Sequence, residues 1–175
     1  RKFLEEHDIP VQVMAKTGLR GVLKGKPGGK TVVLRADIDA LPLKEEGDKE
    51  YMSKNPGAAH ACGHDGHMAI ALGVIRWLKE SDWPQKGSGE ILFIFQPAEE
   101  GGAGAKAMLD TGIFDPEPIE AVFAGHMHPE HPAGHIGIAP EISNAAADNF
   151  IITLKGKGGH GAHPHQCKDP IVAGA

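Results

Sequence analysis

The apolar run Ile-Leu-Phe-Ile-Phe at residues 91–95 is the feature that most restricts how this chain of 175 residues can fold. All of its side chains are apolar, so it lacks the alternation of a strand that has one face in water. A glycine-containing turn precedes the run and Pro97 follows it closely, and both interrupt regular structure. This pattern is typical of a strand buried on both faces of a sheet, so we expect an α/β fold.

Shorter hydrophobic patterns predict the elements around this strand. Four apolar residues in the segment 66–80 recur at helical spacing and predict an amphipathic helix packed on a sheet: Ile70, Val74, Trp77 and Leu78. We also predict strands at 11–14, 20–24, 30–36 and 121–124, the last one short and buried, and a helix from about 103 to 109. The alternation of strands and helices predicts a largely parallel or mixed sheet covered by helices.

Polar side chains follow several of these strands at the point where each strand ends. Asp39 follows the third strand, Glu99 and Glu100 follow the central one, and His126 follows the last. In open sheets of this kind, ligands bind beyond the carboxyl ends of the strands. We therefore expect one edge of the sheet to collect these four side chains.

A cluster of cysteine and histidine lies at residues 60–67, in the order His-Ala-Cys-Gly-His-Asp-Gly-His. One residue separates Cys62 from His64, which is too close for one face of a helix but suits a turn around a single cation. With the glutamates after residue 95 and the histidines after residue 124, thiolate, imidazole and carboxylate could meet in space. Such mixed ligation is typical of a catalytic zinc, manganese or cobalt centre rather than a closed structural one.

Composition narrows the class of protein. A net charge of −5 and a pI near 6.1 provide no basic field for a phosphate backbone, so nucleic acid is not an expected partner. The sequence has no long apolar run, so we expect no membrane span. Two cysteines do not make a disulfide framework, which favours a reducing compartment and a cytoplasmic location.

The pattern changes near the end of the chain. From about residue 149, Phe150, Ile152 and Leu154 alternate with other side chains, which predicts a half-solvated strand and a domain boundary near 145–149. Asp169 and Pro170 then signal the start of a helix, but the sequence stops at Ala175. We therefore expect the chain to be a fragment of a longer protein.

Four motifs, in this order, closely resemble those of one family: Arg35–Pro42, His60–His67, Phe95–Gly101 and Gly158–His165. The family is that of the N-acyl-amino-acid amidohydrolases, which includes hippurate hydrolases, bacterial aminoacylases and plant hydrolases of indole-acetic-acid conjugates. It lies within the wider metallopeptidase superfamily of aminoacylase and carboxypeptidase type. The resemblance covers roughly residues 30–175.

The resemblance implies a two-domain enzyme. A smaller α/β lid domain, which also mediates homodimerisation, interrupts a metallopeptidase-type α/β catalytic domain whose mixed sheet is covered by helices. Residues 1–147 would be the first part of the catalytic domain, and residues 148–175 the start of the lid domain. It also implies a final histidine ligand beyond Ala175, so the isolated chain is expected to bind metal weakly and to hydrolyse nothing.

The resemblance also implies roles for single residues and a reaction. The metal ligands by position are Cys62, His64, Glu100 and His126, and the general base is Glu99. Two divalent ions per full-length subunit, of zinc, manganese or cobalt, would activate water to cleave N-acetyl, N-benzoyl or similar amino acids. Small N-acyl amino acids or peptide-like molecules are the implied substrates.

Three further residues complete the implied site. Asp37 and Asp39 would accept a ring N–H of a ligand histidine and so fix its tautomer. His160, in the lid, would reach the active site of the partner subunit and bind a substrate carboxylate or oxyanion. The chain departs from the family pattern at Met127 and His128, where relatives usually have an asparagine and an aromatic residue.

Two other functions remain open at this point. Cys62 could be the nucleophile of a cysteine hydrolase, which would need an imidazole base and no metal. The chain could also belong to a metal-binding or peptide-binding relative that has lost catalysis.

Overall fold

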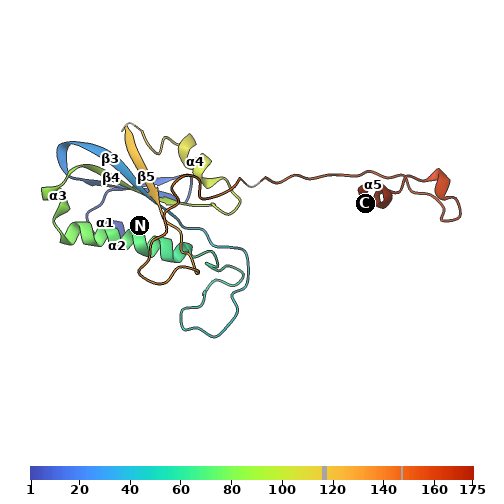
Figure 1. Ribbon diagram of the computed structural model, residues 1–175, viewed down its shortest axis with the longest axis horizontal. Coiled ribbons are helices and arrows are strands. Elements are labelled where there is room, and N and C mark those ends of the chain that lie inside the picture. The colour runs from blue at the N-terminus through green and yellow to red at the C-terminus, as the bar shows by residue number, and fades with distance from the viewer. Residues whose placement is uncertain (116–117, 147) are drawn as a thin grey trace. The chain divides into compact units, whose positions relative to one another are not determined.

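The computed structural model describes residues 1–115, 118–146 and 148–175, and they divide into two compact units (Figure 1). The first unit is Arg1–Glu130 and the second is His131–Ala175. Each unit is described by itself.

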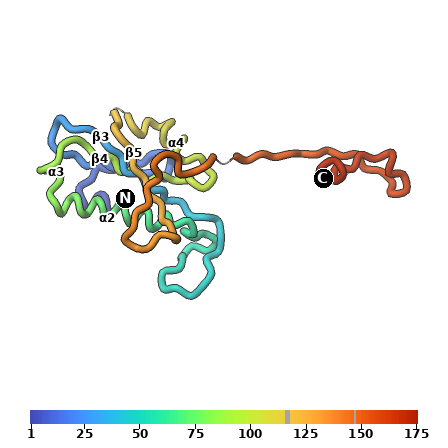
Figure 2. The backbone as a smooth tube through the Cα atoms, viewed as in Figure 1, coloured from blue at the N-terminus to red at the C-terminus, as the bar shows by residue number. Residues whose placement is uncertain are grey.

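A mixed sheet forms the centre of the first unit. Its strands are β1 (Val11–Met14), β2 (Gly18–Lys24), β3 (Lys26–Asp37), β4 (Ser88–Gln96) and β5 (Ile119–Ala124). Within the described residues the sheet has five strands, in the order β1-β2-β4-β3-β5. β3, β4 and β5 run parallel, whereas β1, β2 and β4 pair antiparallel. Figure 2 traces the backbone of this unit. The parallel and antiparallel pairs together confirm the predicted mixed sheet.

β4 carries the core on both of its faces. Phe93 and Phe95 pack with Ile75 in one hydrophobic cluster, whereas Leu92 and Ile94 pack with Met108 in the other. All four strand residues are at most 6% exposed. Burial of one such side chain stabilises the fold by about 1.5–3 kcal/mol. The prediction of a strand buried on both faces is therefore confirmed.

Helices cover the two faces of this sheet. They are α1 (Lys2–Glu6), α2 (His64–Glu80), α3 (Trp83–Lys86) and α4 (Gly104–Asp110). α1 and α2 supply side chains to the cluster around Phe93, and α4 supplies Met108 to the opposite one. The predicted helices at 66–80 and 103–109 are thus confirmed.

The face that α2 turns to the sheet differs in part from the predicted one. Ile75 and Leu78 are buried, but Ile70 is 52% exposed and Trp77 is 65% exposed. The prediction was right for Leu78 and wrong for Ile70 and Trp77. The buried face is instead defined by residues that recur at helical spacing and lie to one side of Ile70 and Trp77: His64, His67, Ala71, Ile75 and Leu78.

β5 is an edge strand, which corrects the prediction of a buried one. It pairs with β3 at the end of the strand order. Val122 and Phe123 are 55% and 59% exposed, and among the described residues of the strand only Ile119 packs against the core, so most of the strand is not buried. An apolar run alone did not distinguish an interior strand from an uncovered edge strand.

The second unit contains a short 3-10 helix at Pro164–Gln166 and the helix α5 (Pro170–Gly174). Asp169 caps α5 as predicted, since its Oδ1 accepts the Ile171 N–H at 2.8 Å. The strand predicted at 150–154 is absent, because the described residues of this unit include no neighbouring strand to pair with it. The assignment of 148–175 to a lid domain stays a prediction. No helix in the described part of the chain has the length and apolar character that a bilayer crossing requires.

Candidate metal centre

Three parallel strands end at the same edge of the sheet. Asp37 on β3 is level with Gln96 on β4, and Arg35 on β3 is level with Ala124 on β5. The residues that follow these positions therefore emerge at one edge, as the sequence predicted. This edge carries the two glutamates after β4 and the histidine after β5.

A turn at the start of α2 adds the cysteine and histidine of the 60–67 cluster. Gly63 caps the helix with φ at +81°, in the left-handed region that favours glycine. Cys62 precedes this turn and His64 is the first residue of the helix. A single turn thus delivers a thiol and an imidazole to the strand ends.

His64 is the most deeply placed candidate ligand. It is 1% exposed, and its Nδ1 lies 2.9 Å from the backbone carbonyl oxygen of Asp39, to which it can donate. Its Nε2 then carries a lone pair, but it has no hydrogen-bond partner among the described residues. Because a buried polar atom is normally paired, this lone pair requires an explanation. Nε2 lies 3.7 Å from Glu100 Oε1 and 3.7 Å from Asp37 Oδ2, which is room for a cation between them.

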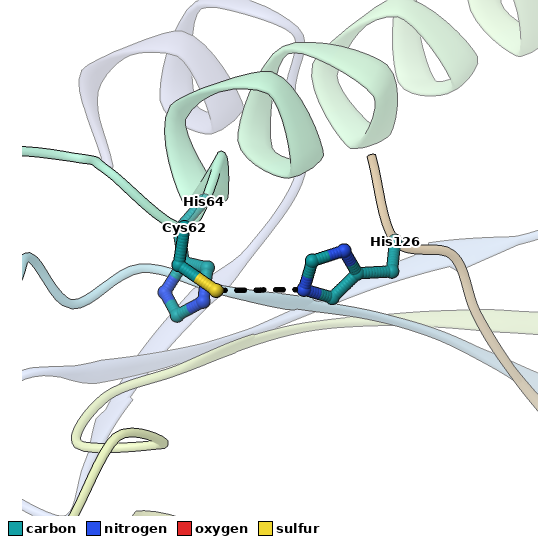
Figure 3. Close-up of side chains that lie close together, drawn as sticks. All are labelled: Cys62, His64 and His126. Atoms are coloured by element: carbon teal, nitrogen blue, oxygen red, sulfur yellow. Dashed lines mark hydrogen bonds between the residues drawn. The ribbon is translucent and has the colours of Figure 1, made fainter. Parts of the chain in front are cut away.

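Cys62 and His126 face each other beside this nitrogen (Figure 3). Cys62 Sγ lies 3.5 Å from His126 Nε2. The pKa of the Cys62 thiol is raised to about 11, first by its hydrogen bond with Glu100, then by burial and by the charges of Glu100, Glu99 and Asp37. The site therefore holds an excess of negative charge, which a divalent cation would neutralise.

Asp39 ties the loop after β3 to the loop after β4. Its Oδ2 accepts the backbone N–H of Glu100 at 3.1 Å. Burial acts to raise the pKa of Asp39, but the backbone N–H groups of Glu100 and Glu99 outweigh it, and the pKa lies below its usual value. Asp39 therefore stays ionised and holds the start of the two-glutamate segment. Its backbone carbonyl, rather than its carboxylate, receives the ring N–H of His64.

Among the residues that the structure describes, three groups of side chains could hold a metal ion, and His64 belongs to all of them. The groups are Cys62–His64–His126, His64–Glu99–Glu100 and Asp37–His64–His67, each with its donor atoms within 4.8 Å of one another. Thiolate, imidazole and carboxylate together suit zinc, and also manganese or cobalt. The residues present thus fit a divalent metal centre, and the structure brings together the four ligands predicted within this chain.

Three residues outside the predicted set of site residues support this centre: Arg35, His67 and Gln96. His67 is 3% exposed and its Nδ1 lies 2.6 Å from Asp37 Oδ1. Arg35 donates to Asp37 and to Gln96 from β3, each at 2.9 Å. The signal that could have found His67 is its position three residues after His64, which places both rings on one side of a helix.

The remaining predicted site residue, His160, belongs to the second unit. Its Nδ1 accepts the backbone N–H of Ala162 at 3.2 Å in a short turn. A contact between His160 and substrate in a partner subunit stays a prediction.

Comparison with known proteins identifies the family. The sequence pattern of peptidase family M20/M25/M40 matches residues 33–174, so the chain belongs to this family. The resemblance drawn from the four motifs is thereby confirmed.

Relatives of known name are similar over most of the chain. The N-acetyldiaminopimelate deacetylase of Listeria monocytogenes serotype 4a (strain HCC23) is 43% identical over 158 residues, which cover 90% of this chain and 42% of that protein. The N-acetylcysteine deacetylase of Bacillus subtilis (strain 168) is 41% identical over 175 residues, which cover 99% of this chain and 45% of that protein.

A solved structure shares the fold. The YXEP protein of Bacillus subtilis, described as a dinuclear metal binding peptidase from the M20 family, aligns with a TM-score of 0.73 and 39% identity. The alignment covers 79% of this chain and 38% of that one. The chain thus spans less than half the length of the relatives it matches.

Proposed function

We propose that the intact protein is a metal-dependent amidohydrolase that releases an amino acid from an N-acyl conjugate. Cys62, His64, Glu100 and His126 hold the metal, and Glu99 is the general base. Membership of the M20 family and the deacetylase names of its relatives support the reaction class. The lone pair of His64 Nε2, buried and unpaired within the described residues, is the observation that carries the metal assignment.

The reaction needs an activated water, a polarised carbonyl and a proton for the leaving nitrogen. A bound divalent ion supplies the first two, since it lowers the pKa of its water from about 15.7 toward about 7 and acts as a Lewis acid. Glu99 takes the proton of the attacking water and delivers it to the leaving nitrogen. Such proton transfer accelerates hydrolysis by about 10²–10⁴-fold.

The adjacent glutamates can divide these roles because their surroundings differ. The backbone N–H of Glu100 is fixed by Asp39, and Glu100 Oε1 faces His64. Both glutamates are exposed, so the side chain of Glu99, which need not face His64, can meet water and substrate. One carboxylate therefore stays at the metal while its neighbour moves protons.

Two measurements on the intact protein test the proposal. Metal analysis should find divalent ions, and chelation should abolish hydrolysis of N-acetyl, N-benzoyl or N-acyl diaminopimelate substrates. Glu99→Gln should keep the metal content and reduce kcat by about 10²–10⁴-fold. A Glu99→Gln protein with normal turnover would exclude Glu99 as the base, and wild-type activity without metal would overturn the proposal as a whole.

The cysteine hydrolase is the second candidate, and the geometry disfavours it. The pKa of Cys62 is about 11, whereas catalytic cysteines have depressed pKa values because the thiolate is the nucleophile. His126 Nε2 lies 3.5 Å from this thiol, but the pKa of the thiol is still raised, by its hydrogen bond with Glu100, by burial and by the charges of Glu100, Glu99 and Asp37. Activity that survives a chelator but not an alkylating reagent would support this alternative.

Features of the whole protein remain part of the proposal. Relatives that act on N-acetyl amino acids favour a small acyl group, and the dinuclear metal binding ascribed to the YXEP protein favours two ions. A homodimer formed through the lid, the contribution of His160 to a neighbouring active site and a cytoplasmic location are predictions of the same kind. Sedimentation of the intact protein and a His160→Ala variant test the first two.

A further inference from the structure

We propose that His67 is a positioning residue that fixes the main chain after β5, so that the His126 ring faces Cys62 and His64. The inference rests on the proposed function, because it assigns His67 to the support of the same metal centre. His67 connects three parts of the first unit: β3, the start of α2 and the segment that carries His126.

The hydrogen bonds of His67 determine its tautomer. Its Nε2 lies 2.8 Å from the backbone nitrogen of Met127, which can only donate, so Nε2 carries the lone pair. Its Nδ1 therefore carries the proton and donates it to Asp37 Oδ1 at 2.6 Å. A neutral imidazole satisfies both partners at once. His67 thus joins a buried carboxylate to the main chain next to His126.

These bonds also exclude His67 as a metal ligand. Both ring nitrogens are engaged, and the second oxygen of Asp37 is paired with Arg35 at 2.9 Å. The group Asp37–His64–His67 is therefore a support rather than a further metal site. The ring of His67 lies next to both ligand rings, with its centroid 5.3 Å from that of His64 and 4.6 Å from that of His126.

Two glycines make room for the segment after β5 that carries His126 and Met127. A Cβ atom at Gly63 would lie 3.1 Å from Met127 Cβ, and one at Gly66 would lie 3.0 Å from Met127 Cγ. Both distances are tighter than ordinary packing, so the missing side chains let Met127 approach the start of α2. Met127 is the next residue after His126, so a shift of this segment displaces the imidazole. The glycines and His67 therefore hold the same main chain by independent contacts.

Two substitutions of His67 in the intact protein separate its two hydrogen bonds. In His67→Asn the amide nitrogen takes the place of Nδ1 and can still donate to Asp37, but Met127 loses its acceptor. In His67→Gln the amide oxygen takes the place of Nε2 and can accept from Met127, but Asp37 loses its donor. The readouts are Co²⁺ affinity by competition with a chelator, the thiolate-to-cobalt absorption band, and unfolding by urea without metal.

A positioning role predicts opposite effects of the two variants. His67→Asn should lower Co²⁺ affinity by about 10–100-fold and alter the cobalt spectrum, with metal-free stability near that of wild type. His67→Gln should keep the affinity and lose stability. His7→Asn is the matched control, because His7, which caps the separate helix α1, also binds through Nδ1, to the Phe3 carbonyl. Unchanged affinity in His67→Asn, or greater loss in His67→Gln, would overturn the role.

Gly66→Ala tests the inference without touching His67 or Asp37. Alanine favours a helix over glycine by up to about 1 kcal/mol, so α2 should be no less stable. The added Cβ requires Met127 to move by a few tenths of an ångström, and Co²⁺ affinity should fall several-fold. Normal affinity in both Gly66→Ala and His67→Asn would refute the inference even if the metal centre is real. A wild-type protein that binds no Co²⁺ would instead refute the proposed function.

Discussion

The buried and the open sides of the candidate metal centre are held in different ways. The buried side is built from β3 and α2 and consists of side chains at most 3% exposed: Asp37, His64 and His67. The open side is built from turns and loops next to the strand ends and consists of more accessible side chains: Cys62, Glu99, Glu100 and His126.

This difference shows which part of the centre exists before a metal binds. On the buried side, Asp37 has hydrogen-bond partners in Arg35 and His67, so its charge is compensated by the protein itself. On the open side, the nearby glutamates help to raise the pKa of the Cys62 thiol, and among the described residues no cationic side chain compensates their charge there. The buried side is therefore a preformed support, and the open side requires a cation for its stability.

His64→Ala should have the largest effect, because His64 takes part in every candidate ligand group. We expect metal affinity to fall by more than about a hundredfold, which exceeds the usual effect of an outer partner. Metal-free stability should fall as well, since a buried ring is lost and the Asp39 carbonyl loses its donor. Chelator competition and urea unfolding measure the two quantities.

Cys62→Ala removes a candidate ligand from the open side and is the variant to compare with His64→Ala. It should weaken metal binding but leave the metal-free free energy of unfolding close to the wild-type value, because the thiol is only partly buried. Equal losses of metal-free stability in His64→Ala and Cys62→Ala would contradict the division into two sides.

Asp37→Asn should have the next largest effect. It should lower the free energy of unfolding and does not remove a metal ligand. The amide cannot accept from both His67 and Arg35, so a buried donor is left unpaired. We expect a loss of about 2–4 kcal/mol in the free energy of unfolding without metal. Glu99→Gln, on the open side, should change the same quantity by less than about 0.5 kcal/mol. A similar loss in both variants would show that the open side is also preformed.

Much of this fold could be predicted from the sequence because the sheet is built around one continuous apolar run. The burial of β4 follows from Ile91–Phe95, and the strand ends then follow from topology. The rotation of α2 could not be predicted, because it depends on the burial of histidines as well as apolar side chains. The exposure of β5 could not be predicted either, because it depends on the neighbours of the strand.

The candidate site, like the fold, has features that could be predicted from the sequence and features that could not. Its ligand types could be predicted, since Cys62, Glu100 and His126 lie beside strand or helix ends, where side chains of this chemistry gather. Asp37 and Asp39 could be expected to support a histidine, but the contacts of His67 could not be predicted, because they join it to Asp37 and Met127, which lie 30 and 60 residues away in sequence. No local pattern records that a backbone N–H selects the tautomer of a distant ring.

The reactivity of Cys62 gives the smallest predicted effect and the most direct test of the charge on the open side. In the metal-free protein the pKa of this thiol is raised from 9.0 to about 11, so below pH 9 less of it is thiolate than in an unperturbed cysteine. Because only the thiolate reacts, iodoacetamide should modify Cys62 about ten to a hundred times more slowly than in urea-unfolded protein at pH 8. The rate in the folded protein should rise about tenfold per pH unit up to about pH 11. Mass spectrometry measures the modification of Cys62 and of Cys167 separately. The modification of Cys167 shows that the reagent is active. Glu100→Gln should accelerate the modification of Cys62 but not that of Cys167. A rate that matches the unfolded protein and ignores Glu100→Gln would show that the open side carries no excess of negative charge.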